Sequence, residues 1–464
     1  MESVPLIIGL QSCNDRYKAT DRRNMTTPTV PESMKRNAEG LGVWEHRGKV
    51  AAVGIGHSPT ARRWDGSADT TIGALAIDAI RKAIADAGVS PDQVDGLVLD
   101  GGTTTGAHWE EGDPVPMDVV NAWNPTSDPL DGIAQLSAEW ILKNMPELTN
   151  VNFTMYGPVC MSNTIVTAAQ AVGDGLTNTC IVLKGWHNLP GRYYQGGANA
   201  VDTRPGLAAI SGLWGGPASY GTALQFAAYC SKYGKNHDMM APFVVQSKEL
   251  GLLFPEGFFA QHRPEAITTE DYLSARWIAK PANLYDNDIP IMCAGAYIFT
   301  TAERAKDMKQ KPVYILNHAS SNTVARSLTP SLDEVEEDTA RTARKLYEGA
   351  GITANDLSFE NMYDGFTLFH QFHIEGLGFR GIKFGEALDF YATDIGIHGP
   401  NPVSPSGGNA GSGRTRFWMH TDCIQQIQGR AGARQITGIK PEIGVSGGPM
   451  PMGGDFTVWG ANPD

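Results

Sequence analysis

The sequence predicts an α/β fold made of two similar halves, and three observations support this prediction. Charged residues make up only 19% of the chain and 53 of its 464 residues are glycine, which is typical of compact α/β proteins with many tight turns. A helix–turn–strand pattern occurs twice, at 81–102 and at 344–365. Between the two copies lies a long stretch, about 186–275, that is rich in Gly, Tyr and Pro.

The first copy follows a short apolar strand, expected at 49–56, that ends at a glycine. The next apolar side chains recur on one face of a helix: Leu75, Ile77, Ile80, Ala83 and Ile84. Gly88 is typical of the residue that ends such a helix. A turn beginning at Ser90 leads to the next predicted strand, 97–99.

The second copy repeats the first at a constant offset and without a gap. Residues 81–90 are matched in character by 344–353, and Asp100 lies where Tyr363 lies. A constant offset over helix, glycine, turn and strand indicates an internal duplication, and its length is too great for a solenoid.

This organisation predicts three parts of the chain. We expect an N-terminal extension at 1–48, an N-terminal half at 49–310 and a C-terminal half at 311–464. The N-terminal half includes the irregular segment 186–275, and loops of that length usually cover a site.

Composition excludes several classes of function. The net charge of −13 and the absence of a run of five or six basic residues argue against nucleic-acid binding. No apolar run approaches the ~20 residues of a membrane helix, and no secretory pattern is present. The six cysteines are scattered, which favours free thiols in a reducing compartment, so we expect a cytoplasmic protein.

Three motifs in the second half of the chain resemble those of thiolases. Residues 406–414 resemble the segment GGxxxxGH, 361–366 resemble the NEAF or HDCF segment, and 445–448 resemble the Gly-rich C-terminal loop. They occur in the family's order, and the resemblance extends from about Lys49 to the end. The phrase at 284–290, LYDNDIP, is most similar to the sterol-carrier and lipid-transfer branch.

The resemblance implies a duplicated, five-layered αβαβα thiolase fold in which the central helices of the two halves meet in the middle. It also implies that a CoA thioester is bound as the substrate. The glycines of two motifs are the candidate binding residues: Gly407, Gly408, Gly447 and Gly448.

The catalytic positions depart from the thiolase pattern. The nucleophilic Cys, which thiolases place at a helix N-terminus to lower its pKa, falls on Pro158, two residues before Cys160. The His of GGxxxxGH is replaced by Arg414. The second Cys falls on Gly365 in the sterol-carrier version or on Val445 in the ordinary version. A Claisen enzyme needs both a thiolate and a base, and the chain lacks them at these positions.

One group of thiolase-like proteins with this departure is the steroid side-chain-cleaving aldolases, which the chain resembles. The resemblance implies retro-aldol cleavage of a β-hydroxyacyl-CoA with tyrosines as proton carriers. Tyr363, at the NEAF Asn or HDCF His position, is the first candidate, unless it is a packing residue. Arg414, expected in a helix first turn, is a candidate to stabilise a phenolate or to bind the enolate oxygen.

Other candidate proton carriers are Tyr220, before a predicted helix, and His420, in a predicted helix. The tyrosines Tyr193 and Tyr194 are further alternatives. For each of these a packing role is the competing interpretation.

His370 and His373 have the i, i+3 spacing of metal ligands, but no acidic or Cys partner lies close in sequence. We therefore expect no metal and no cofactor beyond the CoA thioester of the substrate.

Two other functions stay open from the sequence: an acyltransferase that uses Cys160, and a non-catalytic lipid carrier or scaffold. The resemblance further implies a homodimer joined through edge strands. It also implies an OB-fold and zinc-ribbon (DUF35-type) partner, with a possible link to a hydratase.

Overall fold

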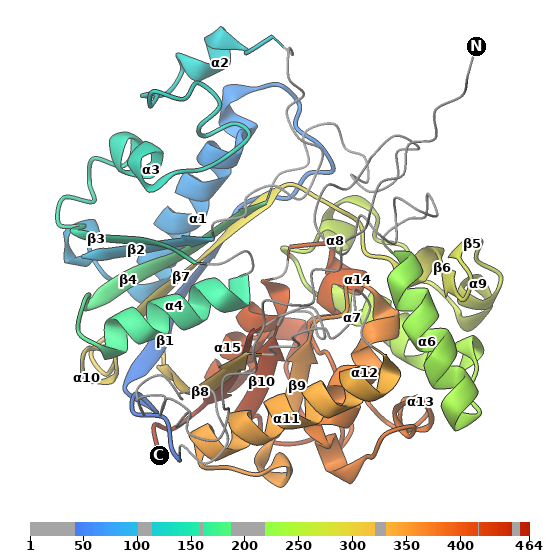
Figure 1. The fold of residues 1–464 in the computed structure, drawn as a ribbon. Helices are drawn as coiled ribbons and strands as arrows, with labels where there is room; N and C mark the ends of the chain where they lie inside the picture. Colours follow the sequence, from blue (N-terminus) through green and yellow to red (C-terminus); the bar gives the residue numbers. More distant parts are fainter. Residues whose placement is uncertain are drawn as a thin grey trace, which may run out of the picture.

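The computed structural model describes residues 42–100, 114–157, 161–186, 219–320, 331–415, 417–447 and 455–464. Within these ranges the chain forms a nine-stranded sheet with the strand order β3-β2-β4-β7-β1-β8-β11-β10-β9, together with a small two-stranded sheet, β5-β6. Helices cover the strands on both faces (Figure 1).

The N-terminal half supplies the first five strands of that order. The strands are β1 (Val50–His57), β2 (Gly96–Asp100), β3 (Phe153–Gly157), β4 (Thr179–Trp186) and β7 (Cys293–Thr301). The helices are α1 (Ile72–Ala87), α2 (Met117–Val120), α3 (Ala138–Asn144), α4 (Met161–Gly173) and α10 (Ala302–Ala305).

The C-terminal half supplies the other four strands. They are β8 (Val313–Ser320), β9 (Phe359–Met362), β10 (Ile443–Gly447) and β11 (Asp455–Gly460). The helices are α11 (Leu332–Ala350), α12 (His370–Leu377), α13 (Ala387–Phe390), α14 (Gly408–Ser412) and α15 (Trp418–Gln428).

The two halves have the same topology, which confirms the predicted duplication. In the order β2-β4-β7-β1 the first pair is parallel and the next two are antiparallel. The order β9-β10-β11-β8 shows the same sequence of pairings. Gly88 and Gly351, which end α1 and α11 in the left-handed conformation, occupy equivalent positions. An isolated parallel bridge between Glu360 and Val403 corresponds to the pairing of β2 with β3.

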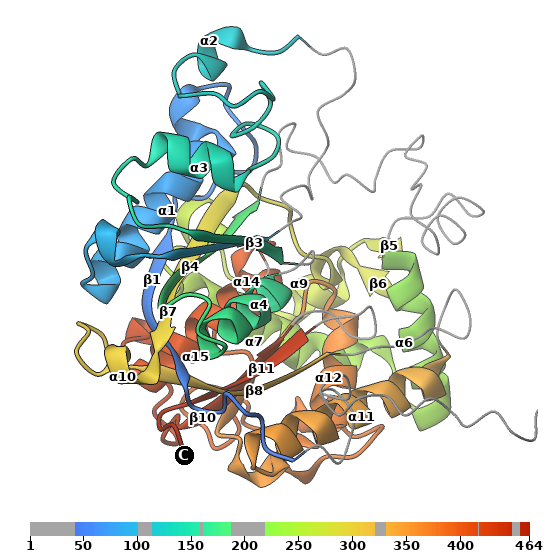
Figure 2. The same ribbon diagram turned by 60° about the vertical axis from the view of Figure 1, so that its left-hand side comes forward.

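The layers follow the predicted αβαβα order. Figures 1 and 2 show α1 outside the N-terminal strands, α4 and α15 between the two sets of strands, and α11 and α12 outside the C-terminal strands. One apolar core joins α4 and α15 to inward side chains of both sets of strands, such as Tyr297 and Trp459. A second core lies on the outer faces and includes apolar residues of α1 and α11. The duplicated, five-layered arrangement expected from the motifs is confirmed.

The described part of the segment between β4 and β7 contains several helices and a two-stranded sheet. Residues 187–218 lie outside the described residues, and the remainder forms these elements: α6 (Ser219–Tyr233), α7 (Ala241–Leu252), α8 (Phe258–His262), α9 (Thr269–Leu273), β5 (Trp277–Ala279) and β6 (Ala282–Asn283). The expectation of an irregular stretch to residue 275 is therefore wrong from Ser219 onward. Because α7 contacts protein on more than one side, including α9 and α14, its apolar residues do not follow a single-face pattern.

The last residues before β1 are bound to the C-terminal half. Trp44 is buried, its N–H donates to the carbonyl of Gly349 (2.8 Å), and Arg47 Nε donates to the carbonyl of Ala350 (2.6 Å). Residues 1–41 lie outside the described part, so most of the predicted extension is untested. No helix in the described ranges has the length and apolar composition of a membrane span.

Candidate active site

Tyr363 lies directly after β9, at the carboxyl end of a parallel strand pair, and its side chain is buried. In open α/β sheets this edge is where ligands bind. Its counterpart in the first half, Asp100 at the end of β2, forms a buried ion pair with Lys184 of β4 (Oδ2 to Nζ, 2.5 Å). In the first half, a buried ion pair therefore occupies the position that corresponds to Tyr363.

The Tyr363 hydroxyl and the Asp288 carboxylate both border the space beside Gly365. A Cβ atom built on Gly365 would lie 2.2 Å from the Tyr363 hydroxyl oxygen and 2.6 Å from Asp288 Oδ2. The resemblance to the sterol-carrier version of the motif assigns the second Cys to this position. A phenol and a carboxylate therefore occupy the space that a cysteine side chain would fill.

Asp288 reaches this point because its segment is paired on both sides. The N–H of Asp288 donates to the carbonyl of Gly365 (3.0 Å), and the N–H of Arg414 donates to the carbonyl of Ile289 (2.8 Å). The LYDNDIP phrase thus lies between the Tyr363 turn and Arg414.

Asp286 anchors the same segment in the protein interior. Its carboxylate accepts hydrogen bonds from Thr367 (2.6 Å) and Tyr272 (2.9 Å), and it contacts His237 Nε2 (2.7 Å). Thr367 belongs to the C-terminal half, Tyr272 to α9 and His237 to the turn before α7. Asp286 therefore fixes the segment to all three.

Arg414 is buried, and its guanidinium binds Asp288. Nε donates to Asp288 Oδ1 (2.7 Å), and an Nη atom contacts the same oxygen. The expectation that Arg414 starts a helix is wrong: Gly413, with a φ of +98°, follows α14, and Arg414 bridges to Pro290 in an extended segment. The Asp288 carboxylate compensates the charge of Arg414. Arg414 therefore positions this carboxylate near Tyr363 and does not act on the phenol as an unpaired cation.

Asp364 supports the glycine-rich turn. Its carboxylate accepts hydrogen bonds from the N–H groups of Asn409 (2.6 Å) and Ala410 (3.2 Å) in α14. A Cβ on Gly408 would lie 2.1 Å from this carboxylate, so only glycine fits there. Burial raises the pKa of Asp364 to about 7, although the two N–H bonds oppose the shift.

The other predicted binding glycines have packing reasons of their own. Gly407 has a φ of +71°, and its Cβ would lie 2.3 Å from the backbone nitrogen of Gly251 in α7. A Cβ on Gly447, in β10, would meet the ring of Phe456. Gly448 lies outside the described residues. Contact of these glycines with CoA stays a prediction.

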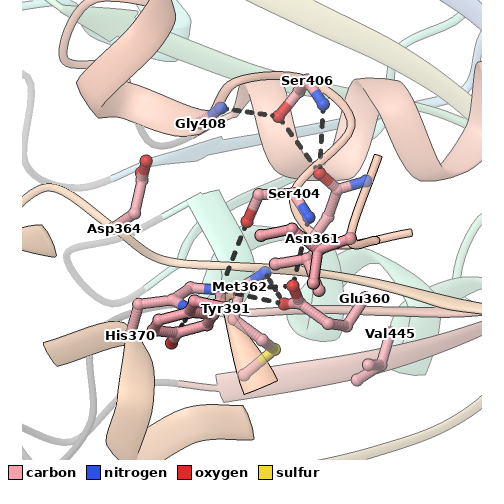
Figure 3. Close-up of polar contacts among 12 residues, drawn as sticks. Glu360, Asn361, Met362, Asp364, His370, Tyr391, Ser404, Ser406, Gly408 and Val445 are labelled. Carbon is pink, nitrogen blue, oxygen red and sulfur yellow. Dashed lines mark hydrogen bonds and ion pairs between the residues drawn. The ribbon is translucent and has the colours of Figure 1, made fainter. Parts of the chain in front are cut away.

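A polar network behind the motif joins β9 to the Val403–Ser404 segment (Figure 3). Glu360 accepts hydrogen bonds from the N–H groups of Met362 (2.9 Å) and Ser404 (3.1 Å) and contacts His370 Nε2 (3.2 Å). His370 Nδ1 is 2.7 Å from the Tyr391 hydroxyl. In the described ranges no three His, Cys, Asp or Glu side chains are arranged to hold a metal ion, and His370 belongs to this network.

A second chain of contacts in Figure 3 leads to the glycine-rich turn. Asn361 Oδ1 accepts a hydrogen bond from the Ser406 hydroxyl (3.1 Å), which itself accepts from the N–H of Gly408 (3.0 Å). The motif of 361–366 is thereby tied to that of 406–414.

His420 lies on α15, as expected, but in the middle layer. Its Nδ1 is 2.7 Å from the Ser446 hydroxyl of β10, and its Nε2 is 3.0 Å from the Ser162 hydroxyl of α4. Burial lowers the pKa of His420 to about 3, so the imidazole is neutral. The structure thus places His420 at the first turn of α4.

Several candidates fall where the structure gives no side-chain position. Pro158, Cys160, Tyr193 and Tyr194 lie outside the described residues. Tyr220 is in the first turn of α6, but its side chain is outside the described part. Val445, the other second-cysteine position, is a buried residue of β10.

Sequence reasoning missed two charged residues of the site, Asp288 and Lys248. Asp288 lies within the LYDNDIP phrase, so the phrase itself was the signal. Lys248 is on α7, buried, with Nζ 2.5 Å from the carbonyl of Ala410 and 3.5 Å from the centre of the Phe259 ring. Burial lowers the pKa of Lys248 to about 7.

Comparison with known proteins identifies the fold. The family model "Thiolase C-terminal domain-like" matches residues 320–452. The structure is similar to that of an Ltp2-ChsH2(DUF35) aldolase, with a TM-score of 0.70 and 21% sequence identity. The match covers 89% of this chain and 98% of that chain. It also matches human mitochondrial 3-ketoacyl-CoA thiolase in complex with CoA, with a TM-score of 0.57, 12% identity and coverage of 90% and 99% of the two chains. The protein has a thiolase fold.

Within that fold the chain resembles the steroid side-chain-cleaving aldolases. It is 27% identical over 424 residues, 88% of this chain and 98% of the other, to 17-hydroxy-3-oxo-4-pregnene-20-carboxyl-CoA lyase of Mycobacterium tuberculosis. It is 26% identical over 374 residues, 78% of this chain and 86% of the other, to the steroid side-chain-cleaving aldolase of Thermomonospora curvata.

Proposed function

We propose that this protein is a carbon–carbon lyase that cleaves a β-hydroxyacyl-CoA by retro-aldol chemistry, with a steroid side-chain CoA thioester as substrate. The products are a ketone or aldehyde and a shorter acyl-CoA. The observation that supports this most directly is at Gly365, where the Tyr363 hydroxyl and the Asp288 carboxylate replace a thiolase cysteine. The named relatives, a steroid-carboxyl-CoA lyase and a side-chain-cleaving aldolase, supply the substrate class.

The chemistry requires one proton to move from oxygen to carbon. In the proposed reaction Tyr363 takes the proton of the substrate β-hydroxyl as its own proton passes to Asp288. The bond between the α- and β-carbons breaks, its electron pair forms the thioester enolate, and the β-carbon becomes a carbonyl. The proton then returns through Tyr363 to the α-carbon, so atoms and charge balance.

Arg414 has a positioning role in this proposal. Its Nε and an Nη atom hold Asp288 Oδ1, which leaves Oδ2 on the side of Gly365 where the Tyr363 hydroxyl also lies. The reaction neither gains nor loses electrons, so we propose that no cofactor takes part beyond the CoA of the substrate. Cleavage that survives prior treatment with a metal chelator is the expected result.

The acyltransferase alternative, with Cys160 as nucleophile, would need a base near the start of α4. His420 lies there, but burial lowers its pKa to about 3, which makes it a weak base, and both its ring nitrogens contact serine hydroxyls. This arrangement gives the alternative no specific support.

The direct test is incubation of the purified protein with a steroid CoA thioester bearing a β-hydroxyl group. Mass spectrometry should show a steroid ketone and a shorter acyl-CoA in equal amounts. Release of free CoA, together with an acyl group attached to the protein and no steroid ketone, would instead indicate an acyltransferase. An intact thioester without acylation would leave the carrier or scaffold function.

We propose a homodimer joined through β3, together with a DUF35-type partner. β3 is the edge strand of the large sheet, and its Met155 and Tyr156 are exposed (41% and 51%). An open edge strand with apolar side chains can extend the sheet across a two-fold axis. The structural neighbour solved as an Ltp2-ChsH2(DUF35) aldolase supports the partner. Sedimentation as a species of only 49.9 kDa at micromolar concentration would contradict the dimer.

A further inference from the structure

Lys248 is a buried lysine on α7 that the proposed reaction does not use directly. Its Nζ donates to the carbonyl of Ala410 (2.5 Å) and lies over the Phe259 ring. Lysines are seldom buried without a reason, since removing the ammonium group from water is costly.

The backbone of Ala410 is held from two directions. The Asp364 carboxylate accepts the N–H of Ala410 (3.2 Å), and Lys248 donates to the carbonyl of the same residue. α14 itself, Gly408–Ser412, contributes no titratable side chain, so these two groups supply the charges that hold this single turn.

The same turn is packed tightly onto α7. A Cβ on Gly411 would lie 1.9 Å from the carbonyl oxygen of Ser247, and a Cβ on Gly251 would lie 2.1 Å from the carbonyl oxygen of Gly411. Gly413 and then Arg414 follow this turn, and Arg414 holds Asp288 at Tyr363. A displacement of α14 would therefore move Arg414.

We propose that Lys248 is a positioning residue of the lyase: with Asp364 it clamps α14 and so holds Arg414 against Asp288 beside Tyr363. This inference rests on the proposed function for its kinetic consequence but not for the clamp itself. Asp364, Asp288 and Arg263 are the charged groups that act on Lys248, and His370 and Asp288 act on Asp364.

The clamp has a charge requirement. Asp364 accepts two N–H bonds best as a carboxylate, and the Lys248 ammonium favours that ionised form. Without Lys248, burial keeps Asp364 protonated to a higher pH, and the clamp closes only in alkaline solution.

The test variant is Lys248→Met, which keeps the packing over Phe259 and removes the charge. Lys143→Met, on the exposed helix α3, is the matched control. We expect kcat for thioester cleavage at pH 7 to fall about 10²-fold in Lys248→Met, with KM little changed, and to recover as pH rises. A loss of the same size at every pH would show a merely structural role, and wild-type kcat throughout would exclude the clamp.

An infrared titration tests the clamp without any substrate. The carbonyl stretch of protonated Asp364, identified by its loss in Asp364→Asn, should disappear with a midpoint near pH 7 in the wild type. In Lys248→Met the midpoint should rise by about one unit or more. An unchanged midpoint overturns the inference. If the midpoint shifts while the wild type cleaves no β-hydroxyacyl-CoA, the clamp stands and the proposed function fails.

Discussion

The Tyr363 hydroxyl oxygen and Asp288 Oδ2 both lie beside Gly365, at 2.2 and 2.6 Å from the point where a Cβ would stand. The two residues come from different parts of the chain: Tyr363 follows β9, and Asp288 lies in the segment that precedes β7. A glycine is required at position 365 for this arrangement, since any side chain there would occupy the same space.

The first prediction is that Gly365→Ala displaces Tyr363 and lowers kcat by about 10-fold or more, because a 1 Å displacement of a catalytic group can cost about 10²-fold. The measurement is steady-state cleavage of the steroid thioester. Gly221→Ala in α6, where a Cβ meets no described atom within 4 Å, is the control and should keep full activity. Equal activity of both variants would show that the arrangement of Tyr363 and Asp288 beside Gly365 is dispensable.

The second prediction concerns the buried pair of Arg414 and Asp288. Asp288→Asn leaves the Arg414 charge uncompensated, so the free energy of unfolding should fall by about 3–5 kcal/mol. The double variant Asp288→Leu, Arg414→Met removes both charges and should recover most of that loss without recovering activity. Chemical denaturation measures both, and a double variant as unstable as the sum of its single variants would contradict the pairing.

The third prediction is the pH dependence of stability that arises from His420. The folded protein holds the pKa of this histidine at about 3, against a model-compound value of 6.5. Between these values the unfolded chain binds more protons than the folded one, so stability falls as pH falls from about 6.5 toward 3.

His420→Gln should remove about 1.4 kcal/mol per pH unit of this slope, as measured by chemical denaturation at several pH values between 4 and 6. The control is His398→Gln, since His398 is exposed. A wild-type slope in His420→Gln would mean that the buried imidazole does not titrate as inferred.

The duplicated fold was predictable because its signals are local. The helix, the glycine that ends it and the next strand lie within about 20 residues, so the match of 81–102 with 344–365 is visible in sequence alone. Tyr363 was predictable for the same reason, since its motif fixes its place after a strand.

Asp288 and Lys248 were missed because their roles depend on contacts between distant residues. Asp288 and Arg414 are 126 residues apart, and Lys248 and Ala410 are 162 apart. The conformation of Arg414 was mispredicted for a related reason: the backbone pairing with Pro290, which draws it into an extended segment, is also long-range.

The measurement that tests the account most directly compares Tyr363→Phe with Cys160→Ala in cleavage of a β-hydroxyacyl-CoA steroid. Tyr363→Phe keeps the ring and removes only the hydroxyl, so kcat should fall by about 10²–10⁴-fold with little change in substrate binding. Cys160→Ala should retain most of the wild-type rate, because no acyl-enzyme forms. An inactive Cys160→Ala beside an active Tyr363→Phe would contradict the lyase mechanism and indicate an acyltransferase.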